Sequence, residues 1–163
     1  MNMPRVNVHA SCVILARSGV SLGAPRDAGV LILGESGSGK SDLALRLIAM
    51  GAVLVADDRC DLYVSSNLIY AAAPQTLAGL IEVRGVGIIS MPHEPQAHIT
   101  LAARLTDQNA ITRLPEPARY RPPPPLDLPE ECRPREILLA PLEASAPAKI
   151  IAAVANCARA ERQ

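Results

Sequence analysis

The segment GESGSGKS, residues 34–41, decides the fold, because it fits the pattern G-x-x-x-x-G-K-[ST] in full. An apolar run, residues 28–33, precedes it, and a helix-like segment, residues 42–48, follows it. A strand, a glycine-rich turn and a helix in this order form a phosphate-binding loop. Glycines let the backbone curl so that several N–H groups converge on phosphate oxygens, and the helix presents its positive end to the same anion. The alternative is a glycine-rich turn that binds nothing.

Two side chains of this loop have the chemistry to hold a nucleotide. Lys40 can reach the β and γ phosphates. The hydroxyl of Ser41 can bind magnesium, which prefers hard oxygen ligands and keeps phosphates and waters in its shell. The candidate nucleotide-binding residues of the loop are Gly34, Glu35, Ser36, Gly37, Ser38, Gly39, Lys40 and Ser41.

Length and composition limit the class of protein. We expect residues 1–163 to form one domain. Apolar residues make up 49% of the chain and aromatic residues 2%, so Val, Ile, Leu and Ala must fill the core. Basic and acidic residues number 16 each, which gives no overall field for nucleic acid or a membrane, and we expect neither as a partner. Four cysteines without a C-x-x-C pair are typical of reduced thiols, so we expect a cytoplasmic protein.

The apolar patterns predict a mixed β-sheet with helices packed on it. The chain is rich in strand patterns and lacks the steady alternation of strand and helix that a fully parallel sheet requires. Strands are expected at residues 6–15 (a pair or one bent strand), 28–33, 52–56 (a central strand), 62–64 and 68–71 (a hairpin), 98–105 and 137–140. Helices are expected at residues 40–50, 74–80 and 146–161, a hairpin loop at 16–27, and an irregular proline-rich segment at 115–134.

Two adjacent aspartates, Asp57 and Asp58, follow the apolar run at residues 52–56. Carboxylates beside a bound triphosphate either hold magnesium or take a proton from the incoming nucleophile. Neighbouring residues on a strand point to opposite faces, so these two should not aim at one atom unless the strand has already ended. We assign Asp57 to the base and Asp58 to support of the metal site. The alternative is a solvated turn after a strand.

A charged pair, Glu82 and Arg84, lies among the β-branched residues of segment 81–89. If the segment is extended, the two side chains share a face, which places an acid that can hold a metal beside a guanidinium that can bind phosphate. Gly85 and Gly87 would permit close backbone approach. The alternative is an edge strand with a surface ion pair, which contributes little to stability.

Together these three motifs resemble the catalytic domain of the HPr kinase/phosphorylase family, bacterial enzymes that phosphorylate a serine of the phosphocarrier protein HPr. The resemblance covers residues 6–90. It rests on the loop followed by Asp42, on segments 54–61 and 81–89, and on His9 in the strand before the loop. It implies a mixed α/β fold related to that of phosphoenolpyruvate carboxykinase. The chain is similar to short proteobacterial members of the family that lack the N-terminal domain.

The resemblance also implies ligands and roles. ATP is the expected phosphoryl donor with Mg²⁺, HPr the expected partner, and a homo-oligomer the expected assembly. Asp57 would act as the base, or as the acid in the reverse direction, and Glu82 would support a second metal. His9 would contact the transferred phosphoryl group or its acceptor, although a lone strand histidine is as often a satisfied core residue.

Two other functions remain open at this point. One is a regulatory module that binds nucleotide and a partner without phosphoryl transfer. The other is an enzyme that removes phosphate from the carrier with phosphate or water as acceptor. The aspartate pair favours an enzyme, because simple binding needs no base.

Overall fold

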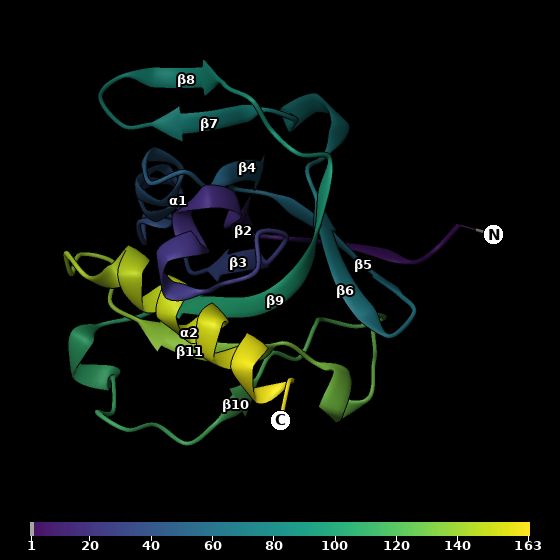
Figure 1. Ribbon diagram of the computed structural model, residues 1–163. Coiled ribbons are helices and arrows are strands. Elements are labelled where there is room, and N and C mark those ends of the chain that lie inside the picture. Colours follow the sequence, from purple (N-terminus) through teal and green to yellow (C-terminus); the bar gives the residue numbers. More distant parts are fainter. Residues whose placement is uncertain (1) are drawn as a thin grey trace.

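A computed structural model describes residues 2–163 and shows a curled β-sheet with two α-helices packed on it (Figure 1). The helices are α1 (Lys40–Ala49) and α2 (Ala146–Ala160). The strands are β1 (Arg5–Val8), β2 (Ala10–Ile14), β3 (Gly29–Leu33), β4 (Val53–Ala56), β5 (Cys60–Ser65), β6 (Leu68–Ala72), β7 (Leu80–Val83), β8 (Gly87–Ser90), β9 (Gln96–Leu105), β10 (Ala118–Arg119) and β11 (Arg135–Leu139). Short 3-10 helices are η1 (Ala16–Leu22), η2 (Gln75–Leu77), η3 (Gln108–Ala110) and η4 (Glu130–Cys132).

The main sheet is mixed, which confirms the predicted fold class. Its strands follow the order β1-β5-β6-β9-β3-β2-β4, and β11 pairs with β9. The long strand β9 runs parallel to β3 and β11 and antiparallel to β6, so it connects the β1-β5-β6 part of the sheet to the part formed by β3, β2 and β4. The predicted β5–β6 hairpin is also confirmed, with Ser66 and Asn67 at positive φ in its turn.

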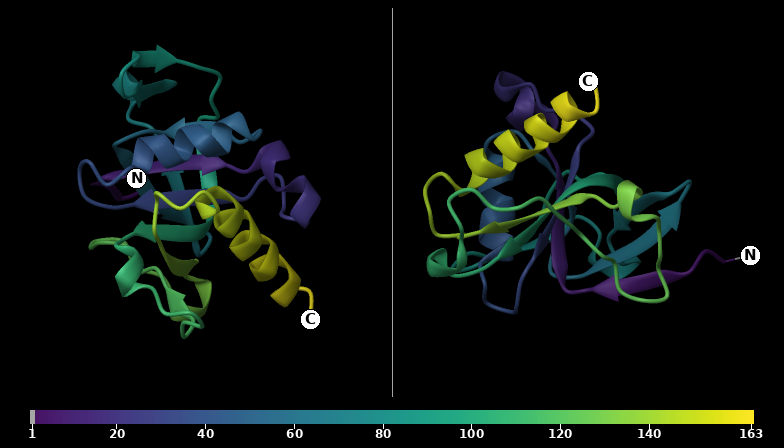
Figure 2. Two further views of the ribbon diagram at one scale, coloured as in Figure 1. Left: turned by 90° about the vertical axis from the view of Figure 1, so that its left-hand side faces the viewer. Right: turned by 90° about the horizontal axis from the view of Figure 1, so that it is seen from below.

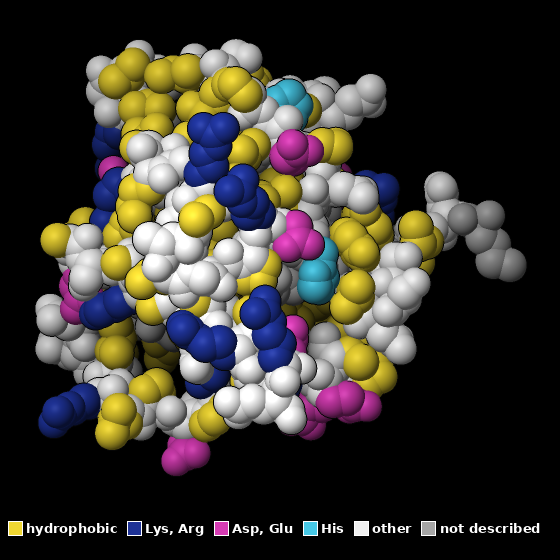
Figure 3. Space-filling view, in the orientation of Figure 1, with side chains coloured by type: hydrophobic (Ala, Val, Ile, Leu, Met, Phe, Trp, Pro, Cys, Tyr) yellow, Lys and Arg dark blue, Asp and Glu magenta, His cyan; other side chains and the backbone are white. Residues whose placement is uncertain are grey.

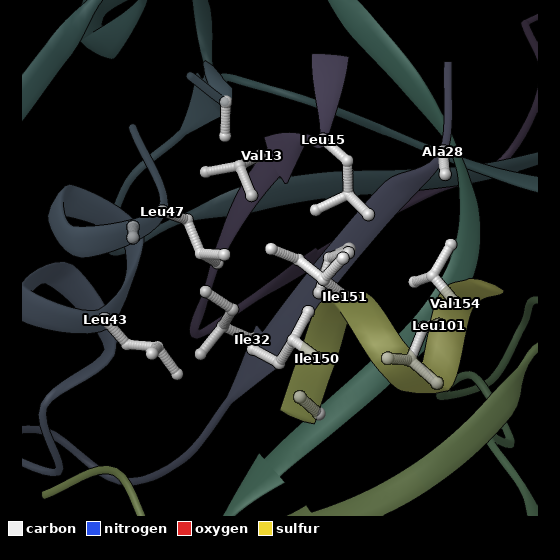
Figure 4. Packing of buried hydrophobic residues seen from close by; sticks show 14 of the residues in the cluster. Val13, Leu15, Ala28, Ile32, Leu43, Leu47, Leu101, Ile150, Ile151 and Val154 are labelled. Atoms are coloured by element: carbon white, nitrogen blue, oxygen red, sulfur yellow. The ribbon is translucent and has the colours of Figure 1, made fainter. Parts of the chain in front are cut away.

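Strand β3 is buried on both faces, which explains its unbroken apolar sequence. Alternate residues of a strand point to opposite sides. Val30 and Ile32 therefore belong to a core cluster under α1 and α2, and Leu31 and Leu33 belong to a second cluster on the other face. Figure 4 shows side chains of both helices pointing onto the sheet in the first cluster. The second cluster includes Tyr120, Leu126 and Leu128 from the proline-rich segment.

The prediction that residues 52–56 form a central strand was wrong. Strand β4 lies at the end of the main sheet and pairs along its length only with β2. The strand is apolar because both of its faces are covered by core residues, and not because it has a neighbouring strand on each side. Leu54 belongs to the first core cluster and Val55 to the second, and the chain near His93 covers the outer edge through a bridge to Leu54.

Several other segments differ in detail from the prediction. Only η2 forms within residues 74–80, because the backbone after Leu77 leaves the helical region at Ala78. The connection between β2 and β3 contains η1. Residues 6–15 form two strands, β1 and β2, which pair with different neighbours on either side of His9. The proline-rich segment is irregular apart from β10 and η4, as predicted.

The β7–β8 hairpin forms a separate two-stranded sheet and stands away from the body above α1 (Figure 2). Ile81 anchors it in the first core cluster. Hydrophobic side chains gather at the top of the face in Figure 3, over this hairpin, where Val86 and Ile88 are 71% and 74% exposed. Within the described residues 2–163, no helix combines the length and apolar character needed to cross a membrane.

Candidate nucleotide and phosphoryl-transfer site

The glycine-rich loop, residues 34–41, connects the carboxyl end of β3 to the first turn of α1. Gly37 and Gly39 adopt φ angles of +78° and +97°, which L side chains rarely tolerate. Gly39 is the N-cap of α1, and its carbonyl accepts the N–H of Leu43. The first turn of a ten-residue helix therefore opens directly into the loop.

Lys40 folds back over the loop that precedes it. Its Nζ donates hydrogen bonds to the carbonyl oxygens of Gly34 at 2.8 Å and Glu35 at 2.7 Å. Burial lowers the pKa of the Lys40 ammonium, and the negative charges of Asp58 and Asp57 oppose that shift. The ammonium is thus bonded to the loop and feels the charges of both aspartates.

The interior of the loop has the chemistry of an anion site. Among residues 2–163, the Ser38 Oγ is the one buried side-chain oxygen or nitrogen without a hydrogen-bond partner. A Cβ at Gly34 would approach this oxygen to 2.4 Å, so the loop has no room for a side chain there. An unpaired hydroxyl, a lysine ammonium and a helix N-terminus around one glycine-rich turn fit the phosphates of a nucleotide.

Asp57 is 5% exposed and accepts three hydrogen bonds. Its Oδ1 accepts the hydroxyls of Ser41 at 2.7 Å and Ser11 at 2.8 Å. Its Oδ2 accepts the backbone N–H of Glu82 at 3.0 Å. Both oxygens are therefore held inside the protein, with one of them facing the last residue of the phosphate loop.

The Asp58 carboxylate is open to solvent, and its charge acts on the Lys40 ammonium together with that of Asp57. The backbone of Asp58 has φ +64°, and its side chain is 61% exposed. The Nε2 of His9 lies 2.6 Å from Oδ1 of Asp58. An ionised carboxylate can only accept, so the imidazole donates in this contact.

The structure brings together Lys40, Ser41, Asp57, Asp58 and His9, all of which the sequence analysis singled out. The two aspartates have different partners, although strand β4 ends at Ala56 and the alternation of strand faces therefore does not separate them. Their different environments lead us to propose the opposite division of roles from the one predicted. The carboxylate of Asp57 is enclosed next to Ser41, which suits the metal side of the site. The carboxylate of Asp58 is open to solvent, where a protein hydroxyl can reach it.

Glu82 and Arg84 do not share a strand face as predicted. Strand β7 ends at Val83, and Arg84 lies in the turn that Gly85 closes with φ +83°. Both charged side chains are exposed, and no ion pair within residues 2–163 joins them. Glu82 meets the site through its backbone N–H on Asp57.

Ser11 is a site residue that the sequence analysis missed. It is fully buried on β2, and its hydroxyl also accepts the backbone N–H of Asp58 at 3.3 Å. The available signal was a single hydroxyl in the otherwise apolar run at residues 10–15. That signal is weak, because many buried serines only satisfy the backbone.

The residues present fit a magnesium ion bound together with phosphates. The Ser41 hydroxyl donates a hydrogen bond to Asp57, which leaves lone pairs of the Ser41 oxygen free for a cation. No three His, Cys, Asp or Glu side chains within the described part of the chain form a metal site by themselves. Magnesium usually takes one or two protein ligands and fills its shell with phosphate and water.

Fold and site together define a mixed α/β protein built around a glycine-rich loop of the P-loop pattern, with two divergent aspartates beside it. The chain belongs to the HPr serine kinase C-terminal domain family, whose family model matches residues 16–98. The matched range contains the loop, both aspartates and the β7–β8 hairpin, whereas His9 and Ser11 precede it.

Individual relatives agree with this assignment. An HPr kinase/phosphorylase of Acidovorax sp. is 52% identical over 64 residues, which cover 39% of this chain and 20% of the relative. The HPr kinase/phosphorylase of Clostridium acetobutylicum is 48% identical over 64 residues, again 39% of this chain and 21% of the relative. The matches thus span about a fifth of these relatives.

A solved structure matches nearly the whole chain. The Hpr(Ser) kinase/phosphatase of Coxiella burnetii superimposes with a TM-score of 0.73 at 25% identity. The match covers 97% of this chain and 99% of that one. The similarity of fold therefore extends through β9, β11 and α2, beyond the range of the family model.

Proposed function

We propose that this protein transfers the γ-phosphoryl group of ATP to a serine of the HPr phosphocarrier protein. The observation that carries the proposal is the divergence of Asp57 and Asp58 beside the loop. One carboxylate is buried against Ser41, and the other is exposed and held by His9. A module that only binds nucleotide needs no such exposed base.

The loop would hold the nucleotide through its backbone N–H groups and Lys40. In the structure the Lys40 ammonium donates to two loop carbonyls, and an ammonium has three N–H donors. We infer that the remaining donor meets a phosphate oxygen when ATP binds. Phosphoryl transfer depends mainly on such positioning and on stabilisation of charge.

Ser41 and Asp57 are the residues that would hold magnesium. When bound, the ion would neutralise negative charge on the β and γ phosphates. Asp57 orients the Ser41 hydroxyl by accepting its hydrogen bond, and the Glu82 N–H orients Asp57 by donating a hydrogen bond to it. In this proposal Glu82 contributes its backbone rather than a carboxylate ligand, and Arg84 in the adjoining turn remains a candidate contact for phosphate.

Asp58 would accept the proton of the attacking serine. The serine oxygen forms a bond to the γ phosphorus while the bond from that phosphorus to the bridging oxygen of ADP breaks. His9 holds the Asp58 carboxylate through its Nε2–H, so the base keeps one orientation. A general base of this kind contributes about 10²- to 10⁴-fold to a rate.

The reverse direction uses the same groups. A protonated Asp58 would return its proton to the serine oxygen while inorganic phosphate or water takes the phosphoryl group. The names of the relatives, kinase/phosphorylase and kinase/phosphatase, support the proposal that this site works in both directions.

The test is the mass of the carrier protein. HPr incubated with this protein, ATP and magnesium should gain one phosphoryl group on a serine, and the Asp58→Asn variant should lose about 10²-fold or more of that rate. A carrier whose mass stays unchanged with the wild-type protein would refute the proposed kinase activity. Release of phosphate from phosphoserine-HPr tests the reverse direction separately.

A further inference from the structure

Ser11 connects the two aspartates through one hydroxyl group. It donates to Oδ1 of Asp57 at 2.8 Å and accepts the backbone N–H of Asp58 at 3.3 Å. A serine hydroxyl can do both at once, because it has one proton and two lone pairs. The side chain is fully buried on β2, so water does not compete for either contact.

The backbone at this point is strained. Asp58 adopts φ +64°, in the left-handed region that non-glycine residues rarely enter. Such a conformation persists where the surrounding structure imposes it. Three hydrogen bonds impose it here: Ala10 N–H to Asp58 O at 3.2 Å, Arg59 N–H to Asp57 O at 2.7 Å, and Asp58 N–H to Ser11 Oγ.

This left-handed turn gives the two carboxylates different surroundings. Strand β4 has already ended at Ala56, so the alternation of strand faces does not set their directions. Asp57 meets Ser41 and Ser11, whereas Asp58 meets His9. Among residues 2–163, Ser11 is the one side chain hydrogen-bonded both to the carboxylate of Asp57 and to the peptide N–H of Asp58.

We propose that Ser11 is a positioning residue of the transfer reaction, which couples the orientation of the metal-side carboxylate Asp57 to that of the base Asp58. The inference rests on the proposed function. Within residues 2–163, the hydrogen bonds of the Ser11 hydroxyl go to the two aspartates, so its effect on the reaction would pass through them.

A second buried serine provides the matched control. Ser18 lies in η1 and is also buried, but its hydroxyl donates to the carbonyl of Leu15, which is not a residue of the site. Ser18→Ala removes a buried hydroxyl of the same kind without affecting the aspartates. Ser11→Ala removes the bridge, and Ser11→Thr keeps a hydroxyl at the same position.

The kinetic experiment compares these variants with HPr, ATP and magnesium. Ser11→Ala should lower kcat about 10- to 100-fold, the usual effect of losing a partner that orients a ligating carboxylate. KM for ATP should stay within about twofold, because the loop and Lys40 are intact. Ser11→Thr should recover most of kcat, and Ser18→Ala should leave it unchanged. An unchanged kcat in Ser11→Ala, or an equal loss in Ser18→Ala, would overturn the inference.

A second measurement does not depend on transfer. Hydrogen exchange at the Asp58 amide, followed by NMR, should accelerate in Ser11→Ala and stay slow in Ser18→Ala. Unchanged protection of this amide in Ser11→Ala would overturn the bridge itself. If the wild-type protein transfers nothing to HPr, the proposed function fails, while the exchange result still decides whether Ser11 holds Asp58.

Discussion

Lys40 is the residue on which nucleotide affinity should depend most. Its buried ammonium is the cation of the phosphate loop, and hydrogen bonds to charged groups contribute about 1.5–3 kcal/mol. Lys40→Ala should therefore weaken ATP binding by roughly tenfold or more in calorimetry. Lys149, the other lysine of the chain, lies on α2 and pairs with Glu143, so Lys149→Ala is the control with the same loss of charge. Equal affinities of Lys40→Ala and wild type for ATP would contradict this assignment.

The residues of the site were predictable to the extent that the signal is local. The loop, Lys40 and the aspartate pair follow from adjacent positions in the sequence. Ser11 was not predictable, because only the antiparallel pairing of β2 with β4 brings it to residues 46 and 47 positions further along the chain. The different environments of Asp57 and Asp58 depend on a left-handed backbone angle that the apolar pattern before them does not indicate.

At the scale of elements, one arginine ties the loop before α2 to the helix after the phosphate loop. Arg46 on α1 donates to the carbonyls of Pro141 and Glu143 and pairs with Asp42. Pro141 lies next to Gly39, 3.5 Å from where a Cβ would be. The segment from Pro141 to the start of α2 is thus held against the phosphate loop.

Loss of the hydrogen bonds from Arg46 should make residues 141–145 more mobile without unfolding the protein. Arg46→Ala should lower the free energy of unfolding by about 1–2 kcal/mol and speed amide exchange at residues 141–145. Arg46→Lys should recover only part of both, because lysine lacks the planar fork that reaches two carbonyls. The exposed Arg113 provides a control, Arg113→Ala. Exchange at residues 141–145 that is the same in Arg46→Ala and wild type would show that Arg46 does not hold them.

The proline-rich segment should give the protein an alkaline pH dependence of stability. Burial raises the pKa of Tyr120 to about 12, above the value near 10 of an unfolded chain. Between these two values the unfolded state loses the tyrosine proton and the folded state keeps it, so stability falls as pH rises. The loss reaches about 2–3 kcal/mol.

Urea unfolding at pH 8 and pH 11 measures this dependence. Tyr120→Phe should reduce the decrease by about 1 kcal/mol at pH 11. The rest belongs to other buried groups, chiefly the thiols of Cys12 and Cys60, whose pKa values burial also raises. Tyr70→Phe is the control, since Tyr70 is only partly buried on β6. A decrease of the same size in Tyr120→Phe would assign it to other groups.

Most elements were predictable from periodicity and turn residues, and the failures have a common cause. Strand β4 is as apolar as a central strand because helices, sheet and the chain near His93 cover it. Which segments cover a strand depends on the whole fold and cannot be predicted from the strand's own residues. The segment with Glu82 and Arg84 looked extended throughout, yet Gly85 and Gly87 turn it into a hairpin. In both cases the residue pattern predicted burial or strand preference correctly. It did not indicate which segments would lie beside the strand.

At the scale of the whole molecule, we propose that residues 1–163 fold as one cooperative domain. The two core clusters lie on opposite faces of the same strands, and β9 contributes to both. Ile150→Ala in the first cluster and Leu126→Ala in the second should each cost about 2–5 kcal/mol. Each variant should shift one common transition, whether helix circular dichroism or tyrosine fluorescence follows it. Two separate transitions in either variant would indicate two independent units.

The assembly of the molecule remains a prediction. The resemblance implies a homo-oligomer, and the exposed Val86 and Ile88 on the β7–β8 hairpin are apolar side chains that another surface could cover. Sedimentation of the wild-type protein across a range of concentrations measures its oligomeric state.

The division of labour between the aspartates is best tested by one paired measurement, magnesium-dependent ATP affinity and the rate of phosphoryl transfer to HPr for Asp57→Asn and Asp58→Asn. We expect Asp58→Asn to bind magnesium-ATP like the wild type and to transfer phosphate at least about 10²-fold more slowly. Asp57→Asn should lose the part of the affinity that depends on magnesium. Full transfer by Asp58→Asn, or magnesium-ATP affinity unchanged in Asp57→Asn, would contradict the assignment of these roles.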